Sequence, residues 1–205
     1  MADLYFFVHK DKIEDVVDCG LKLSEWYDRE IAIPEIGDNR KVIKTFLNPR
    51  DDLKKLKDTQ FRCLRLQVEL EYCWVADASL YRMGQEDSGI MEQYLNNIVP
   101  LKDYCFGTFK NPEALVLTSV LPEYIEVTGV ALDIPLLYEN SETLYLVNLL
   151  EKYEQLHNDS GNHLLYAFFT YLESKGEVSR FEDKEHKNVV FFYKDSKEYT
   201  VLRIP

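Results

Sequence analysis

Residues 64 to 72 alternate strictly between apolar and polar side chains, and this pattern constrains the fold more than any other part of the chain. The apolar members are Leu64, Leu66, Val68, Leu70 and Tyr72, and the polar members between them are Arg65, Gln67, Glu69 and Glu71. A period of two places alternate side chains on opposite faces of a strand. The segment is therefore predicted to be a half-buried antiparallel strand. Residues 73–76 are expected to continue its sheet after a bend.

Other segments carry their own signals for strands and helices. Strands are predicted at residues 4–8, 114–118 and 125–132, and a hairpin at residues 189–193 and 199–204. A short helix is predicted that Asp11 caps and that Gly20 ends in the left-handed conformation, and further helices are predicted at residues 51–56 and 88–98. A long helix is expected to begin at Asn140 or Ser141, to break at residues 159–161, and to be followed by a second helix that ends at Gly176.

Residues 24–45 contain mixed charges, Pro34 and Gly37, and they show no clear period. They are predicted to form a long loop with at most one helical turn, which could serve as a lid or in target recognition.

The order of these segments is strand-rich as far as residue 135 and then runs helix, helix, hairpin. This order predicts an α+β fold with a core at residues 1–135 and a helix–helix–hairpin extension at residues 136–205 that packs on the core. A winged-helix unit that reads DNA is the alternative for the extension. The second helix offers Glu173 and Lys175 but no row of Arg, Asn or Gln, so a packing role is favoured.

Composition argues against several classes of binding partner and binding site. The 205 residues have a net charge of −12, which argues against a broad nucleic-acid surface but allows a local basic cleft. The four cysteines form no C-x-x-C pair and have no histidine at ligand spacing, so we expect reduced thiols and no metal site. No signal peptide or membrane-spanning run is recognisable, and a cytoplasmic protein without membrane contact is expected.

Four short segments place a polar residue beside a strand or a turn. They are Leu4-Tyr5-Phe6-Phe7-Val8-His9, Asp18-Cys19-Gly20-Leu21, Phe46-Leu47-Asn48-Pro49-Arg50 and Pro112-Glu113-Ala114-Leu115-Val116. Strand ends can hold such side chains still and leave them open to a ligand. A pocket built from His9, Arg50 and Glu113 is therefore predicted. The chain contains no G-x-G-x-x-G, P-loop or G-x-S-x-G motif, so a Rossmann or α/β-hydrolase mechanism lacks support.

The order of these segments and their residue patterns resemble those of the DarT-type ADP-ribosyltransferases, which are toxins that attach ADP-ribose from NAD to a DNA base. The family's first strand, I-Y-H-I-T-H-x-x-N-L, is matched by residues 4–9, with Phe6 where the family has its first histidine. Its Gly-Leu-x-Ser turn is similar to residues 20–24, its Y-F-N-P-R segment to residues 46–50, and its E-x-L-V strand to residues 113–116. The resemblance covers about residues 4–130.

The resemblance implies a mixed or antiparallel β core with flanking helices, and NAD as a consumed substrate without a metal. Glu113 would hold the ribose 2′-hydroxyl and assist the acceptor, and Arg50 would neutralise phosphate or position the acceptor. His9 would hydrogen-bond the nicotinamide side. The remaining residues assigned to the NAD site are Phe6, Gly20, Leu21 and Asn48. A nucleic-acid target, with a DNA base favoured, and a neutralising antitoxin partner are implied as well.

Such residues suit the chemistry of the nicotinamide–ribose bond. Its cleavage passes through an oxocarbenium-like state that a carboxylate stabilises. Structural explanations stand beside this one: Glu113 follows Pro112 at a strand start, Arg50 precedes two aspartates, His9 can be a core histidine, and Asn48 can shape a turn. The alternative function is therefore an ADP-ribosyltransferase-like binding or scaffold protein without turnover.

Overall fold

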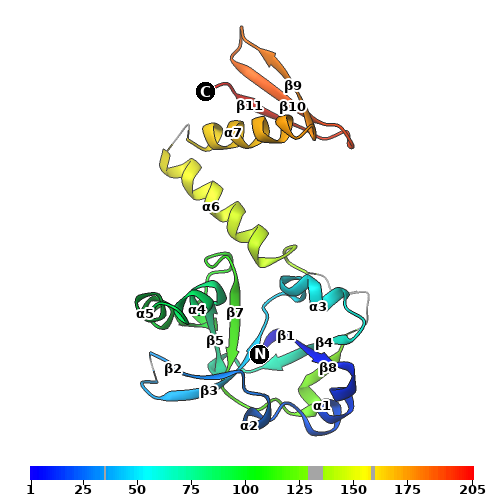
Figure 1. Ribbon diagram of the computed structural model, residues 1–205, viewed down its shortest axis with the longest axis vertical. Helices are drawn as coiled ribbons and strands as arrows, with labels where there is room; N and C mark the ends of the chain where they lie inside the picture. Colours follow the sequence, from blue (N-terminus) through cyan, green and yellow to red (C-terminus); the bar gives the residue numbers. More distant parts are fainter. Residues whose placement is uncertain (35, 129–135, 158–159) are drawn as a thin grey trace. The chain divides into compact units, whose positions relative to one another are not determined.

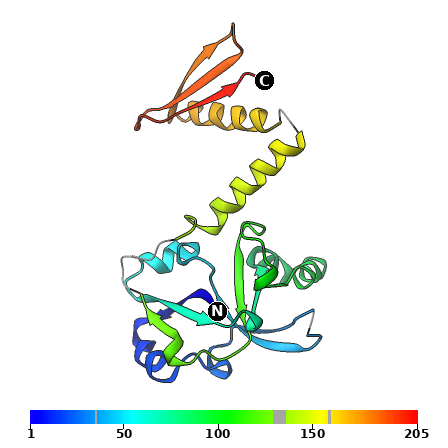
Figure 2. The same cartoon turned by 180° about the vertical axis from the view of Figure 1, so that it is seen from behind.

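The computed structural model describes residues 1–34, 36–128, 136–157 and 160–205 (Figures 1 and 2). Within this described part the α+β class is confirmed, with three antiparallel sheets and seven α-helices. The chain divides into two compact units, residues 1–146 and 147–205. The division falls inside helix α6 (Ser141–His157). Among the described helices, none has both the length and the apolar character that a membrane crossing requires.

The first sheet contains the strand predicted from the alternating segment. Its order is β1 (Ala2–His9), β4 (Phe61–Val68) and β8 (Ile125–Val127), with Phe6 paired to Leu64. Leu64, Leu66 and Val68 are buried, as expected. The strand ends earlier than predicted, because Leu70–Tyr72 form a 3₁₀ turn and Leu70 and Tyr72 are each 40% exposed. This turn leads the chain into a different sheet.

The second sheet has the order β2 (Arg29–Ala32), β3 (Asn39–Thr45), β7 (Pro112–Val116), β5 (Cys73–Asp77) and β6 (Val99–Pro100). The expected long loop at residues 24–45 is therefore wrong. That region holds helix α2 (Leu23–Trp26) and the hairpin β2–β3. Its period is obscured because neighbouring residues Val42 and Ile43 are both buried, one on each face of β3.

Strand β3 joins the two sheets along one edge. The backbone oxygen of Val42 accepts a hydrogen bond from Asp28 N at 2.8 Å, next to β2. Four residues further on, Phe46 exchanges two backbone hydrogen bonds with Tyr5 of β1, at 2.8 and 2.7 Å. Lys44 lies midway between Val42 and Phe46. Its backbone N–H and C=O point to the same edge of β3 as theirs, because alternate residues of a strand direct these groups to the same edge. The sheets thus separate beside Lys44.

Helices cover both sheets of this unit. Helix α1 (Ile13–Cys19) follows a 3₁₀ turn and has no side-chain cap, so the prediction that Asp11 caps it is wrong. The short helical segment after Asn48 is confirmed as a 3₁₀ turn at Pro49–Asp52 followed by α3 (Leu53–Lys57). Helix α5 (Ser88–Asn96) is confirmed, and with α4 (Ala78–Gly84) it packs on the second sheet through Tyr94.

The second unit contains the predicted C-terminal hairpin, β10 (Asn188–Tyr193) and β11 (Tyr199–Arg203). A third strand, β9 (Val178–Asp183), extends the sheet to the order β11-β10-β9. Helix α7 (Ser160–Ser174) lies across one face and closes a small core with Phe169, Phe191 and Leu202 (Figure 1). The predicted helix break at residues 159–161 is wrong at Ser160 and Gly161, which belong to α7. Residues 129–132, predicted to continue β8, lie outside the described part of the chain.

Candidate functional site

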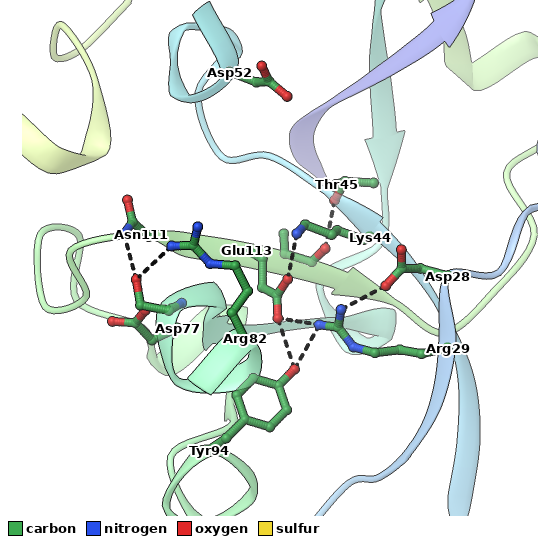
Figure 3. A network of polar contacts seen from close by, with 12 residues as sticks. Asp28, Arg29, Lys44, Thr45, Asp52, Asp77, Arg82, Tyr94, Asn111 and Glu113 are labelled. Carbon is green, nitrogen blue, oxygen red and sulfur yellow. Dashed lines mark hydrogen bonds and ion pairs between the residues drawn. The ribbon is translucent and has the colours of Figure 1, made fainter. Parts of the chain in front are cut away.

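Glu113 is the most deeply buried carboxylate among the described residues, and a polar network surrounds it. It is the second residue of β7, and its side chain is 1% exposed (Figure 3). Its Oε1 accepts hydrogen bonds from Tyr94 Oη, at 2.9 Å, and from the Arg29 guanidinium. Its Oε2 lies 3.2 Å from Lys44 Nζ and accepts no hydrogen bond from any described residue. One carboxylate oxygen is thus held firmly, while the other has only an ion-pair partner.

Arg29 and Tyr94 form the rigid side of this network. Arg29 also pairs with Asp28 at 2.7 Å, and its guanidinium carbon lies 3.7 Å from the centre of the Tyr81 ring. Burial, the largest single influence, would lower the pKa of Arg29, but Glu113, Tyr94 and Asp28 together outweigh it and raise that pKa. Burial, and then the charge of Glu113, raise the pKa of Tyr94. Both side chains therefore act as fixed donors to the carboxylate.

Glu113 lines a cavity of about 440 Å³ whose wall is rich in cations. The basic side chains in its wall are Lys44, Arg50, Lys54, Arg82 and Lys110. Arg50 is exposed, and its side chain makes no hydrogen bond or ion pair with a described residue. The same wall also holds four carboxylates, Asp51, Asp52, Glu113 and Glu142, and Lys110 pairs with Glu142 at 3.1 Å. Five cations against four acids is a small local excess of positive charge in a chain whose net charge is −12, and it favours an anionic ligand at the unpaired cations.

A second cavity of about 520 Å³ adjoins the first. It is lined by the aromatic side chains of Phe6, Phe7, Trp26 and Tyr27. The two cavities share four wall residues, which are Lys44, Phe46, Asp51 and Asp52. The wall of the second cavity also holds four acids, Glu25, Asp28, Asp51 and Asp52, and two lysines, Lys44 and Lys55. Aromatic side chains thus distinguish the second cavity from the first, while both walls carry charges of both signs.

Asn48 and Asp51 hold the segment that carries Arg50. The Asn48 side chain is buried, its Oδ1 accepts from Arg50 N at 2.9 Å, and its Nδ2 donates to Tyr138 O at 3.0 Å. Asp51 accepts hydrogen bonds from Ser141 N and Ser141 Oγ, each at 2.8 Å. Burial raises the pKa of Asp51, although the bonds from Ser141 oppose that rise. Asn48 therefore positions Arg50 and has no side-chain group left for a cofactor.

The structure brings together only some of the residues assigned from the sequence. Arg50 and Glu113 line one cavity, and Phe6 lines the adjoining one. His9 lines neither cavity; it is the last residue of β1, although Phe7 on the same face of that strand lines the second cavity. Its Nδ1 lies 3.2 Å from Asp11 Oδ2, and its ring contacts Phe61 edge-on. The expectation that His9, Arg50 and Glu113 share one pocket is therefore corrected.

Gly20 and Leu21 are structural residues. Leu21 is fully buried, and its backbone N–H and C=O both bond to Val120, at 2.8 and 3.0 Å. Gly20 ends α1 with φ of 75°, and a Cβ atom there would lie 2.3 Å from Val120 O. The chain needs glycine at this position for close packing, and neither residue lines the two cavities around Lys44.

Sequence reasoning does not find the partners of Glu113, which are Arg29, Lys44 and Tyr94. The first two lie in the region that was expected to be a loop. The alternation of Lys41-Val42 and Lys44-Thr45 within a Val/Ile-containing run is the signal that could have indicated a strand there. Tyr94 lies on the predicted helix at residues 88–98, where nothing in the sequence separates it from an ordinary core aromatic.

Comparisons with protein-family models, with curated proteins and with solved structures find no match for this chain. The chemistry of the site therefore has to be argued from its geometry. Among the described residues, no group of three or more His, Cys, Asp and Glu side chains is placed to hold a metal ion. What the site offers is a fixed carboxylate, several cations and an aromatic wall.

Proposed function

We propose that this chain is an NAD-dependent ADP-ribosyltransferase that modifies a nucleic acid or another macromolecule. The observation that carries the proposal is the position of Glu113 Oε2. This oxygen belongs to a carboxylate held by Arg29 and Tyr94 in the wall of a cavity that also holds five basic side chains. It is buried next to Lys44 Nζ, so a ligand reaches it only when the Lys44 side chain moves aside. The order of the sequence segments that resemble the DarT-type enzymes supports the same activity.

The roles of the protein groups follow from charge. When the bond between nicotinamide and ribose C1 breaks, nicotinamide leaves with the bonding electrons, and positive charge develops on the ribose. A carboxylate in a water-poor wall stabilises that charge strongly. The acceptor nucleophile then forms the new bond to C1, and Glu113 Oε2 can take the proton that it loses.

The two cavities fit the parts of NAD. Arg50 has no ion-pair partner among the described residues, and Lys44, which pairs with Glu113, lies in both walls, so these two side chains are the cations offered to the pyrophosphate. Asp51 and Asp52 also belong to both walls and oppose a bound anion. Phe6 and Trp26 pack edge to face, with ring centres 5.9 Å apart, and offer apolar contacts to a planar ring. The histidine that the sequence assigned to the nicotinamide side has no part in this arrangement.

The remaining cations of the first cavity are available to bind the acceptor. Lys54, Arg82 and Lys110 line the first cavity but not the second. Lys110 pairs with Glu142 at 3.1 Å, so Lys54 and Arg82 are the two of these cations without an acid partner among the described residues. A phosphate-bearing acceptor is the class that such a wall favours. A nucleic acid fits that class better than water does.

The activity is tested by incubating the chain with NAD and a mixture of single-stranded DNA, RNA and protein, and by measuring nicotinamide release and transfer of labelled ADP-ribose. We expect Glu113→Gln to lower the rate at least about 100-fold. The matched control is Glu92→Gln, an exposed glutamate of α5, which should leave the rate unchanged.

Glu113→Gln also disturbs a buried ion pair, so a second variant is needed. Arg50→Met removes an exposed charge and should keep the fold while raising the KM for NAD about 10-fold or more. Wild-type protein that is folded but never releases nicotinamide with any acceptor would refute the enzyme.

One observation favours the alternative, a binding protein without turnover. Glu113 is neutralised by two cations, Arg29 and Lys44, before any ligand arrives. A carboxylate compensated in this way stabilises a developing positive charge less well. In that case NAD should raise the melting temperature while nicotinamide stays bound to ribose.

A further inference from the structure

The outer face of the sheet in the second unit is apolar and exposed. α7 contacts the inner face, where Phe191, Val189 and Leu202 are buried. Side chains of the other parity point outward, and their exposed fractions are high: Phe181 65%, Tyr199 63%, Val201 54% and Phe192 44%. Scattered exposed apolar residues are ordinary, but four on one small sheet face mark an interaction surface.

The strand register arranges this outer face in three rows across the sheet. The pairings place Ser179, Phe192 and Tyr199 in the first row, Phe181, Val190 and Val201 in the second, and Asp183, Asn188 and Arg203 in the third. Rings of Phe192 and Tyr199 contact each other with centres 6.2 Å apart. The first two rows are therefore mostly apolar, and the third is polar.

The third row carries opposite charges at opposite edges of the sheet. Asp183 lies on β9 and Arg203 on β11, with Asn188 of β10 between them. Arg203 has no ion-pair partner among the described residues, and Asp183 pairs only with His186 of the adjoining turn. This row can therefore be complemented by a surface with the reversed order of charges.

A second copy of the same face presents that reversed order. When two sheets face each other across a twofold axis that runs along the strands, β9 of one copy lies over β11 of the other. The rows stay aligned, so Asp183 of each copy meets Arg203 of the second copy, and Phe181 meets Val201. We propose that this outer face is a self-complementary surface through which two copies of the chain associate.

A twofold axis across the strands is the other way to pack the faces. It would place the charged third row over the aromatic first row, so neither Asp183 nor Arg203 would meet an opposite charge. Burying a charge without a partner is unfavourable. Charge complementarity therefore selects the axis along the strands.

The size of the patch sets the strength of association. Three exposed aromatic side chains and two valines per copy offer several hundred Å², and two copies bury on the order of 1,000 Å². This lies at the low end for specific interfaces. We expect a reversible dimer with a dissociation constant of about 1 to 100 μM. The association does not depend on the activity proposed above.

The test is sedimentation velocity of the full chain over a concentration series. Wild type should shift from monomer to dimer, and Phe181→Ser should stay monomeric throughout. Asp183→Arg and Arg203→Asp should each weaken the dimer at least 10-fold, and the double variant should regain most of the affinity. Circular dichroism of each variant checks that the unit remains folded.

Tyr171→Ser is the matched control, because Tyr171 is an exposed aromatic residue on α7 and not on the sheet face. It should leave the dimer unchanged. A wild-type chain that is monomeric at millimolar concentration would overturn the proposal. A dimer that ignores Phe181→Ser, or a double charge swap that restores nothing, would overturn it as well.

Discussion

At the scale of single residues, the buried charge of Glu113 dominates the first unit. Arg29 and Glu113 are 7% and 1% exposed, and each would be strongly penalised there without the other. Removing one partner of such a pair leaves an uncompensated charge, whereas removing both can cost little. The contribution of the Arg29–Glu113 pair to the free energy of unfolding can therefore be measured separately from any catalytic role of Glu113, by comparing the single variants with the double variant.

A double-mutant cycle tests this coupling. We expect Arg29→Met and Glu113→Gln each to lower the free energy of unfolding by about 3 to 5 kcal/mol. The double variant should lose clearly less than the sum of the two. Both tryptophans, Trp26 and Trp74, lie in the first unit, so fluorescence during urea unfolding reports on that unit alone. Additive losses would show that the two charges do not depend on each other.

The four cysteines divide into two pairs by their surroundings. Cys19 and Cys105 are exposed, while Cys63 and Cys73 are buried. Burial raises the pKa of Cys63 to about 11 and that of Cys73 to about 12, so both remain protonated thiols near neutral pH. All four are free thiols, as expected from the sequence, but only Cys63 and Cys73 are shielded from reagents.

We therefore expect two thiols to react quickly with a thiol reagent at pH 8 in the native protein, and four after denaturation. Mass spectrometry of the labelled peptides should assign the fast sites to Cys19 and Cys105. Fast labelling of Cys63 in the native state would contradict the buried position of that residue.

At the scale of elements, close contacts between segments decide where the chain can turn. The bridge between Leu21 and Val120 brings the end of α1 against the segment that follows β7. Gly20 makes this approach feasible, because its positive φ and missing Cβ avoid the carbonyl of Val120. Gly20 ends the helix with the positive φ that the sequence predicts, but its ψ of −175° lies outside the left-handed helical region.

Gly20→Ala should accordingly lower the free energy of unfolding by about 2 kcal/mol or more, since strain and collision add. Gly37→Ala is a matched control, because Gly37 also has a positive φ, of 78°, but has no atom within 4 Å of the added Cβ. It should cost only about 1 kcal/mol, from backbone strain. Equal losses in urea unfolding would mean that the contact with Val120 is not what requires glycine.

At the scale of the whole molecule, each of the two units has its own core. The buried residues of the second unit form a separate cluster around Phe169 and Phe191. The side chains of the Glu113 site, and both cavities beside Lys44, belong entirely to the first unit. The site and the proposed dimer surface are thus carried by different units.

A chain that stops after His157 should therefore fold and keep the site. We expect it to retain the tryptophan fluorescence and the NAD-dependent thermal shift of the full chain, and to lose dimerisation. A truncated chain that does not fold would mean that the first unit depends on the second for stability.

Local sequence patterns were sufficient to predict several structural elements of this protein. The alternation at residues 64–68, the helix at residues 88–98, the glycine after α1 and the C-terminal hairpin were predictable, because each depends on neighbours within a few residues. Arg50 and Glu113 were predicted to lie together, and they line one cavity.

Tertiary structure alone decided which charges are buried and which face the cavities. Arg29 meets Glu113 across 84 residues of sequence, and no local pattern distinguishes it from a solvated arginine. The same holds for Lys44, whose place between the two cavities depends on how β1 and β2 share the edge of β3. A charge is retained in the interior only where a distant partner compensates it, and that partner is supplied by the fold.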